Sequence, residues 1–127
     1  MIELDLRHNK SIYEQIVDKF KELIMLDSMK CGEKMPSVRE LSKTLGVNPN
    51  TIQKAYRELE RQGYVYTTTG VGTFVADKKD ISPDADELIK AKEAIGEAFM
   101  ELLFLGLSFE EAYQVVVETI KERKNDL

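Results

Sequence analysis

The sequence contains few of the residues on which enzymes and secreted proteins depend. Among 127 residues there are one cysteine, Cys31, and one histidine, His8, so an intramolecular disulfide and a Cys/His metal cluster are both excluded. A single thiol is typical of a reducing compartment. The sequence also has no Gly-rich phosphate loop and no nucleophile elbow. We therefore expect no catalytic residue, no metal ion and no cofactor, and the chain is not expected to be an enzyme.

Long apolar runs are also missing. The N-terminal residues MIELDLRHNK mix charges with isolated apolar side chains, unlike a signal peptide or a membrane span. We therefore expect a cytoplasmic protein with no membrane partner. With 43% hydrophobic and 32% charged residues, the composition is that of a globular protein. A chain of this length has room for one modest core and an appendage, but not for a separate catalytic domain.

The net charge of −5 is unevenly distributed along the chain. Residues 1–76 carry 11 Lys/Arg and 10 Asp/Glu, whereas residues 77–127 carry 7 and 13. Residues 36–76 contain three acidic side chains and five basic ones, which are Arg39, Lys43, Lys54, Arg57 and Arg61. Local positive potential can therefore coexist with a sequence pI of about 5.0. The composition permits DNA binding without indicating it.

Capping signals predict three helices in the first half of the chain. Residues 2–6 form a short strand or an arm, and a capping box at Ser11–Glu14 begins a helix that runs to about residue 26. A second capping box at residues 37–40 begins a short helix that Gly46 ends. Asn48 is a favourable N-cap and Pro49 a favourable first residue for the third helix, whose inward face is expected to carry Ile52, Ala55, Tyr56 and Leu59.

A hairpin is predicted after the third helix. Two β-prone runs, residues 64–69 and 73–75, flank Gly70–Gly72. The order helix, helix, turn, helix, hairpin is typical of a winged helix-turn-helix. We therefore predict a mainly α fold with a small β-hairpin, in which residues 1–76 form a winged helix-turn-helix DNA-binding domain.

The C-terminal part, residues 77–127, is predicted to be a linker and a two-helix dimerisation hairpin. A long helix is expected to start at Ser82–Pro83 and carries a heptad seam, Gly106 ends it, and Ser108–Glu111 begins the last helix. The seam is too apolar to remain in water, and two helices cannot cover it. We therefore expect a homodimer. Its candidate interface residues are Leu88, Ile95, Phe99, Leu102, Leu105, Tyr113 and Val116.

Five short motifs carry a resemblance to a known family. They are residues 36–41 (PSVREL), 45–51 (LGVNPNT), 55–60 (AYRELE), 63–64 (GY) and 70–75 (GVGTFV). In this order and spacing they closely resemble the GntR family of transcription regulators. The opening residues 12–16 (IYEQI) and the short two-helix tail are similar to the YtrA-like subfamily. The resemblance implies that the third helix enters the major groove, that the second crosses the phosphate backbone, and that the hairpin wing reaches the adjacent minor groove.

The candidate DNA-binding residues come from both the residue chemistry and the resemblance. The start of the third helix offers short polar side chains and exposed N–H groups, which favour phosphates, and Gln53 and Lys54 can read bases one turn later. By resemblance, Arg39 is aimed at the DNA and Gly70 lies at the wing tip. Many relatives have basic residues where this wing has Thr68, Thr69 and Val71. The full candidate set is Ser37, Arg39, Asn48, Asn50, Thr51, Gln53, Lys54, Arg57, Thr69 and Gly70.

The leading hypothesis is a sequence-specific transcription regulator, expected to be a repressor that acts as a homodimer on an inverted-repeat operator of double-stranded DNA. Two alternatives remain open. One is a winged-helix module that contacts protein and has no affinity for DNA, although such a face would need exposed apolar anchors. The other is a ligand-gated switch with a pocket between protomers, whose small-molecule effector is unknown. Operator selection and a thermal-shift screen would discriminate them.

Overall fold

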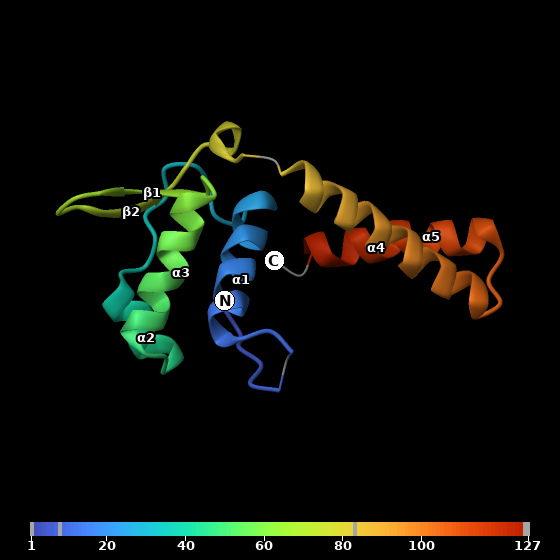
Figure 1. Cartoon of the computed structure of the whole chain (residues 1–127), viewed down its shortest axis with the longest axis horizontal. Helices are drawn as coiled ribbons and strands as arrows, with labels where there is room; N and C mark the ends of the chain where they lie inside the picture. The colour runs from blue at the N-terminus through green and yellow to red at the C-terminus, as the bar shows by residue number, and fades with distance from the viewer. Residues whose placement is uncertain (1, 8, 83, 126–127) are drawn as a thin grey trace. The chain divides into compact units, whose positions relative to one another are not determined.

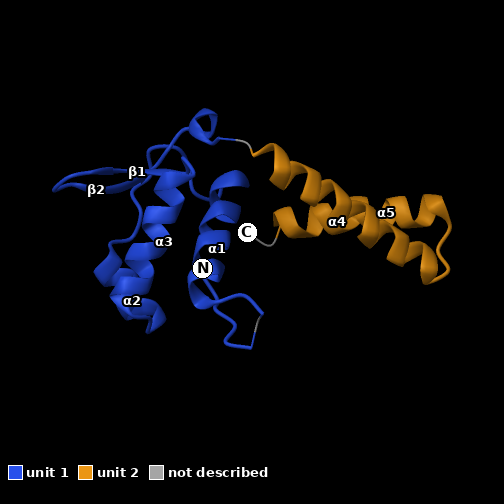
Figure 2. Cartoon of the chain, in the orientation of Figure 1, with its two compact units in different colours: residues 1–82 blue, residues 83–127 orange. Residues whose placement is uncertain are grey.

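The computed structural model describes residues 2–7, 9–82 and 84–125, and the chain divides into two compact units, residues 1–82 and 83–127 (Figure 2). Unit 1 contains α1 (Ile12–Met25), α2 (Val38–Leu45), α3 (Pro49–Arg61), β1 (Val65–Thr68), β2 (Gly72–Val75) and the 3-10 turn η1 (Lys78–Asp80); unit 2 contains α4 (Ala85–Phe104) and α5 (Phe109–Asn125) (Figure 1). The predicted fold class is confirmed. His8 and Pro83 lie outside the described residues.

Helix α1 begins at the predicted capping box. The Glu14 N–H donates to Ser11 Oγ and the Ser11 N–H donates to Glu14 Oε1, both at 3.2 Å. The residues before it form an arm, because residues 2–7 contain no strand. The arm is tied to α1 by Gln15, whose Oε1 accepts the Asp5 N–H at 2.8 Å and whose Nε2 donates to the Asp5 carbonyl at 2.7 Å.

The core of unit 1 lies between α1 and α3 and is closed by α2 and the hairpin. Tyr56, predicted to be a core residue, meets Phe20 edge-on with ring centroids 5.8 Å apart. Its hydroxyl donates to the Pro36 carbonyl at 2.7 Å, which gives the buried polar atom a partner. Burial and the negative charge of Glu40 both raise the pKa of Tyr56, so the hydroxyl stays protonated and remains a donor.

Side-chain caps fix the helix-turn-helix. The Ser37 hydroxyl accepts the Glu40 N–H at 3.0 Å and begins α2, and Gly46, with φ +66°, ends α2 in the left-handed region. The Ser42 hydroxyl donates to the Val47 carbonyl across the turn. Asn48 then caps α3, as its position before Pro49 predicts. The turn between the two helices is therefore held by bonds that the local sequence supplies.

The hairpin β1–β2 projects from the end of α3 as a wing (Figure 1). Val65 pairs with Val75 and Thr68 with Gly72, and the turn closes with a 3.0 Å bond from the Val71 N–H to the Thr68 carbonyl. The second edge of β2 is also paired, because segment 32–35 exchanges three backbone bonds of 2.8–2.9 Å with Thr73 and Val75. The wing is thus held along both edges of β2 at Thr73 and Val75.

Unit 2 is an antiparallel pair of helices. Helix α4 begins at Ala85, not at Ser82–Pro83 as predicted, because the Asp84 carboxylate caps it and accepts the Asp86 N–H at 2.9 Å. The predicted capping box at Ser108–Glu111 begins α5. Among the described residues, no helix is long and apolar enough to cross a membrane.

Candidate nucleic-acid interface

The outward face of α3 carries a row of polar and basic side chains. Its inward face buries Ile52, Ala55, Tyr56 and Leu59, as predicted. On the opposite face, Asn50, Lys54 and Arg57 are exposed at spacings of four and three residues, so they lie along one line of the helix. Gln53 is exposed beside this row and Thr51 is half-buried. These are five of the ten candidate DNA-binding residues.

The backbone N–H groups at the start of α3 are less available to a ligand than the sequence indicated. Asn48 Oδ1 accepts the Asn50 N–H at 2.8 Å, and the Asn48 carbonyl accepts the Thr51 N–H at 3.0 Å. Pro49 has no N–H. The expectation that exposed N–H groups here favour an anion is therefore wrong for the first turn. The polar groups that this end of α3 offers are therefore side chains, mainly the amide of Asn50 and the hydroxyl of Thr51.

Helices α2 and α3 expose basic side chains, beside an exposed acid, Glu40. Arg39 and Lys43 on α2 and Arg57 on α3 are exposed, and within the described ranges none of them forms an ion pair. Arg61 is paired, with its Nε 2.7 Å from Glu58 Oε2, and this guanidinium holds the pKa of the Glu58 carboxyl below its usual value.

The carboxylate of Glu60 is also hydrogen-bonded within the protein. The Thr67 hydroxyl donates to Glu60 Oε1 at 3.1 Å, and the Thr67 N–H donates to Glu60 Oε2 at 3.3 Å. This carboxylate ties the wing to the end of α3. Because Glu58 and Glu60 are both held by neighbours on the protein, the unpaired cations Arg39, Lys43 and Arg57 remain able to attract phosphates.

Lys54 contacts an aromatic ring of α1. Its Nζ is 4.4 Å from the ring centroid of Tyr13 on α1, a cation–π contact worth about 0.5–1 kcal/mol at an exposed site. To reach a base edge, the ammonium has to leave this ring. Tyr13 could not be predicted as a partner of Lys54, because no spacing rule connects a residue of α1 with one on α3.

The wing tip contains Thr69 and Gly70, both exposed. Gly70 has φ +76° at the third position of the turn, and a Cβ built there would meet no atom within 4 Å. In the free protein, the glycine is thus needed for the backbone conformation and not for space. Ser37, another candidate, is exposed, but its hydroxyl already caps α2.

The wing has a basic neighbour that its own sequence does not reveal. Lys34, from the segment between α1 and α2, forms an isolated backbone β-bridge with Phe74. Its side-chain Cε lies 2.8 Å from the position that a Cβ would take at Gly72. The lysine side chain thus lies against the base of the wing. Backbone pairing between distant segments places it there, and only the fold could show this.

The candidate interface residues of unit 2 fall into two groups. Leu88, Ile95, Leu105 and Tyr113 are 53–76% exposed. The other three are half-buried within the hairpin itself: Phe99, whose ring centroid is 5.0 Å from that of Phe109, Leu102 and Val116. The exposed apolar surface also includes residues outside the candidate set, which are Ile89, Met100, Phe104, Phe109 and Ile120.

Comparison with known proteins adds four findings. The family described as "Bacterial regulatory proteins, gntR family" matches residues 12–75. The HTH-type transcriptional repressor YtrA of Bacillus subtilis is 35% identical over 99% of this chain and 100% of its own length. A crystal structure described as a transcriptional antiterminator from Listeria monocytogenes EGD-e is 36% identical, covers 98% of this chain and 92% of that chain, and has a TM-score of 0.77. The AraR DNA-binding domain in complex with operator ORX1 is 31% identical, covers 59% of this chain and 96% of that chain, and has a TM-score of 0.52.

Proposed function

The chain belongs to the GntR family of bacterial regulatory proteins, and from this we propose that it binds an operator as a homodimer and represses transcription. It is a transcription regulator and not an enzyme, since its family and relatives are regulators. Repression is proposed because the Bacillus subtilis relative, matched over its whole length, is a repressor. The regulator acts in the cytoplasm, where its DNA target lies.

The observation that carries the proposal is the outward face of α3. Asn50, Gln53 and Arg57 are exposed there, and their side chains can donate to base edges and phosphates. A related domain of similar fold has been crystallised with its operator. In our proposal α3 enters the major groove, Arg39 and Lys43 of α2 contact the phosphate backbone, and Thr69 and Gly70 of the wing approach the minor groove.

Unit 2 supports the homodimer. Among its described residues, 84–125, Ala112 is the one buried residue, so the two helices have almost no core of their own. Large apolar side chains such as Phe104 and Leu105 are 79% and 76% exposed in the single chain. A surface of this kind is unfavourable in water, and a second copy related by a two-fold axis would cover it. Two identical heads would then favour an inverted repeat.

Selection of bound duplexes from a random DNA pool tests the proposal and identifies the operator. The full chain is incubated with the pool at fixed salt, and bound duplexes are amplified and sequenced over several rounds. We expect two half-sites in inverted orientation at one preferred separation. Enrichment of no sequence would contradict sequence-specific binding, and enrichment of a single unrepeated site would contradict the homodimer proposal.

A further inference from the structure

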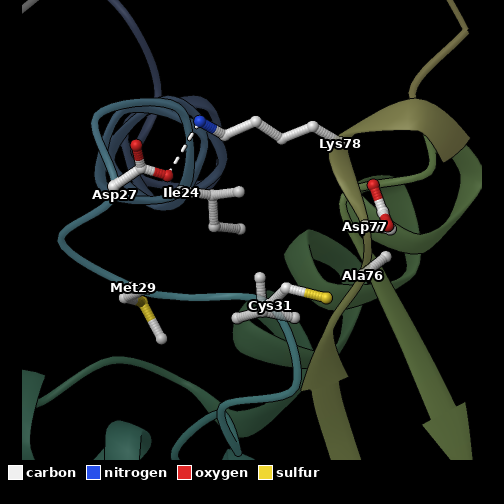
Figure 3. A pocket seen from close by; sticks show the side chains of 8 residues that line it. Ile24, Asp27, Met29, Cys31, Ala76, Asp77 and Lys78 are labelled. Atoms are coloured by element: carbon white, nitrogen blue, oxygen red, sulfur yellow. Dashed lines mark ion pairs between the residues drawn. The ribbon is translucent and has the colours of Figure 1, made fainter.

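The last residues of unit 1, which we call the strap (residues 76–81), are fixed to the winged helix although they belong to none of its core elements. Lys78 Nζ lies 2.8 Å from Asp27 Oδ1 (Figure 3). The same Nζ donates to the Met25 carbonyl at 3.2 Å. Met25 is the last residue of α1 and Asp27 follows it closely. One lysine of the strap thus binds both a charge and a carbonyl at the C-terminal end of α1, where a cation is favoured.

A second anchor lies at the other end of the strap. A Cβ built at Gly63 would be 2.2 Å from the Asp80 carbonyl oxygen and 3.2 Å from Ile81 Cα. No side chain fits between the two backbones, so the strap is in direct contact with the end of α3. The Ala76 N–H also donates to the Tyr64 carbonyl at 3.0 Å, and Asp77 caps η1 by accepting the Lys79 N–H at 3.0 Å.

The first half of the strap leaves open space against the winged helix. A cavity of about 220 Å³ lies beside Ala76, Asp77 and Lys78, and Ile24 and Cys31 lie on its other side (Figure 3). The strap is therefore held by a few specific contacts and not by continuous apolar packing. Removing one of these contacts should loosen the strap without unfolding the core, because only two of the six largest fully buried side chains, Ile24 and Val75, line this cavity.

We propose that the strap is a positioning segment that determines which separation between operator half-sites the regulator accepts. This inference rests on the proposed function, since it requires two heads joined through unit 2. Each winged helix of the proposed dimer is called a head. While the strap is anchored, the chain leaves each head at a defined point, next to the ends of α1 and α3.

The reach of a released strap is large on the scale of the operator. Five freed residues, 77–81, span at most about 17 Å in each chain when fully extended, which sets an upper limit of about 35 Å for the two chains together. One turn of DNA separates half-sites by about 34–36 Å. A released strap would therefore let the same two heads meet half-sites at separations that the anchored strap excludes.

Gly63→Ala tests the second anchor and has a matched control in the same unit. Gly63 has φ +87° and Gly32 has φ +85°, so alanine suffers nearly the same backbone strain at both positions. A Cβ at Gly32 meets no atom within 4 Å, whereas at Gly63 it meets the strap. The difference between Gly63→Ala and Gly32→Ala therefore reports the displacement of the strap.

The first anchor is tested by Lys78→Ala and by Asp27→Asn. Asp27 has φ +61°, and asparagine tolerates this conformation while removing the charge. Lys78→Arg is the conservative variant, because a guanidinium can still bind the Asp27 carboxylate and the Met25 carbonyl. A structural role alone would change thermal stability, but it would not change the preferred separation of half-sites.

The readout is the affinity of each full-length variant for a series of duplexes that carry the selected half-sites at separations varied in single base pairs. A duplex with one half-site serves as the reference, and sedimentation velocity records the oligomeric state. We expect Gly63→Ala, Lys78→Ala and Asp27→Asn to reduce the preference for the best separation by roughly tenfold, because a longer free tether lowers and broadens the effective concentration of the second head. Affinity for the single half-site stays unchanged, and Gly32→Ala and Lys78→Arg behave as the unmodified chain.

Two failures can be told apart. If the unmodified chain is monomeric or indifferent to separation, the proposed dimer on an inverted repeat is wrong. If the unmodified chain prefers one separation and all three strap variants keep the same preference, the dimer proposal stands and the strap is not the positioning segment.

Discussion

Replacing Ile95 tests the proposed dimer more cleanly than any other change in unit 2. Ile95 is 65% exposed in the single chain, so a monomer would lose little when it is replaced. Leu102 is half-buried within the hairpin, and a charge there would disturb the hairpin itself. Ile95→Ala and Ile95→Glu therefore report association more specifically than Leu102→Glu does.

The size of the effect follows from the exposed area. Full burial of an isoleucine side chain contributes about 1.5–3 kcal/mol, so covering an Ile95 that is 65% exposed contributes about 1–2 kcal/mol. A symmetric dimer covers two copies, about 2–4 kcal/mol in total, which corresponds to a dissociation constant raised roughly 30- to 1,000-fold by Ile95→Ala. Ile95→Glu should raise it further, because it adds two unpaired carboxylates to the interface.

Sedimentation velocity over a concentration series measures this dissociation constant directly. Ala94→Glu is the matched control, because it adds the same charge to an exposed residue of α4 that is not among the candidate interface residues. Circular dichroism checks that the helices remain formed. If Ile95→Glu dimerises with the affinity of the unmodified chain, Ile95 does not lie in the interface and the reasoning from the exposed seam fails.

Three further outcomes are expected. Arg39→Ala and Thr51→Ala should each weaken operator binding by about 1–3 kcal/mol with the fold intact, measured by fluorescence anisotropy at fixed salt; unchanged affinity in both would remove them from the interface. Val71→Lys, at an exposed position of the wing, should steepen the dependence of log K on log salt by about one unit, and an unaltered slope would mean that the wing does not reach DNA. Tyr56→Phe should lower the free energy of unfolding by about 1–3 kcal/mol, because the Pro36 carbonyl loses its 2.7 Å donor; urea denaturation with no shift in midpoint would show that this bond contributes nothing.

Much of unit 1 could be predicted because its signals are local. Ser11 and Glu14 are three residues apart and satisfy each other's backbone, so the start of α1 is encoded in four residues. Asn48 before Pro49 specifies the start of α3 in the same way. Gly70 marks a turn that needs a positive φ. Each of these signals depends on residues within a few positions of one another, and none requires knowledge of the fold.

The features that could not be predicted join residues distant in the chain. Lys54 meets Tyr13, 41 positions earlier, and Lys34 reaches the wing through backbone pairing with Phe74. Lys78 binds Asp27 across 51 positions. Spacing rules apply within one helix or one hairpin, so they carry no information about such contacts.

The start of α4 and the N–H groups at the start of α3 both differ from the prediction, and the physical reason is the same. The prediction placed the start of α4 at Ser82–Pro83. Asp84 caps it instead, because its carboxylate accepts the N–H groups two and three residues later. Asn48 does more than begin α3, because it also accepts the Asn50 and Thr51 N–H groups, which were expected to favour an anion. In both cases a short polar side chain bonded its own backbone first.

The most direct test of the function is a titration of the selected operator duplex with the full chain, followed by sedimentation and by fluorescence anisotropy at one salt concentration. We expect two chains to bind each duplex, with an affinity about 10³-fold or more above that for a scrambled duplex of the same length. One chain per duplex would contradict the dimer. Equal affinity for the operator and the scrambled duplex would contradict sequence-specific recognition by α3.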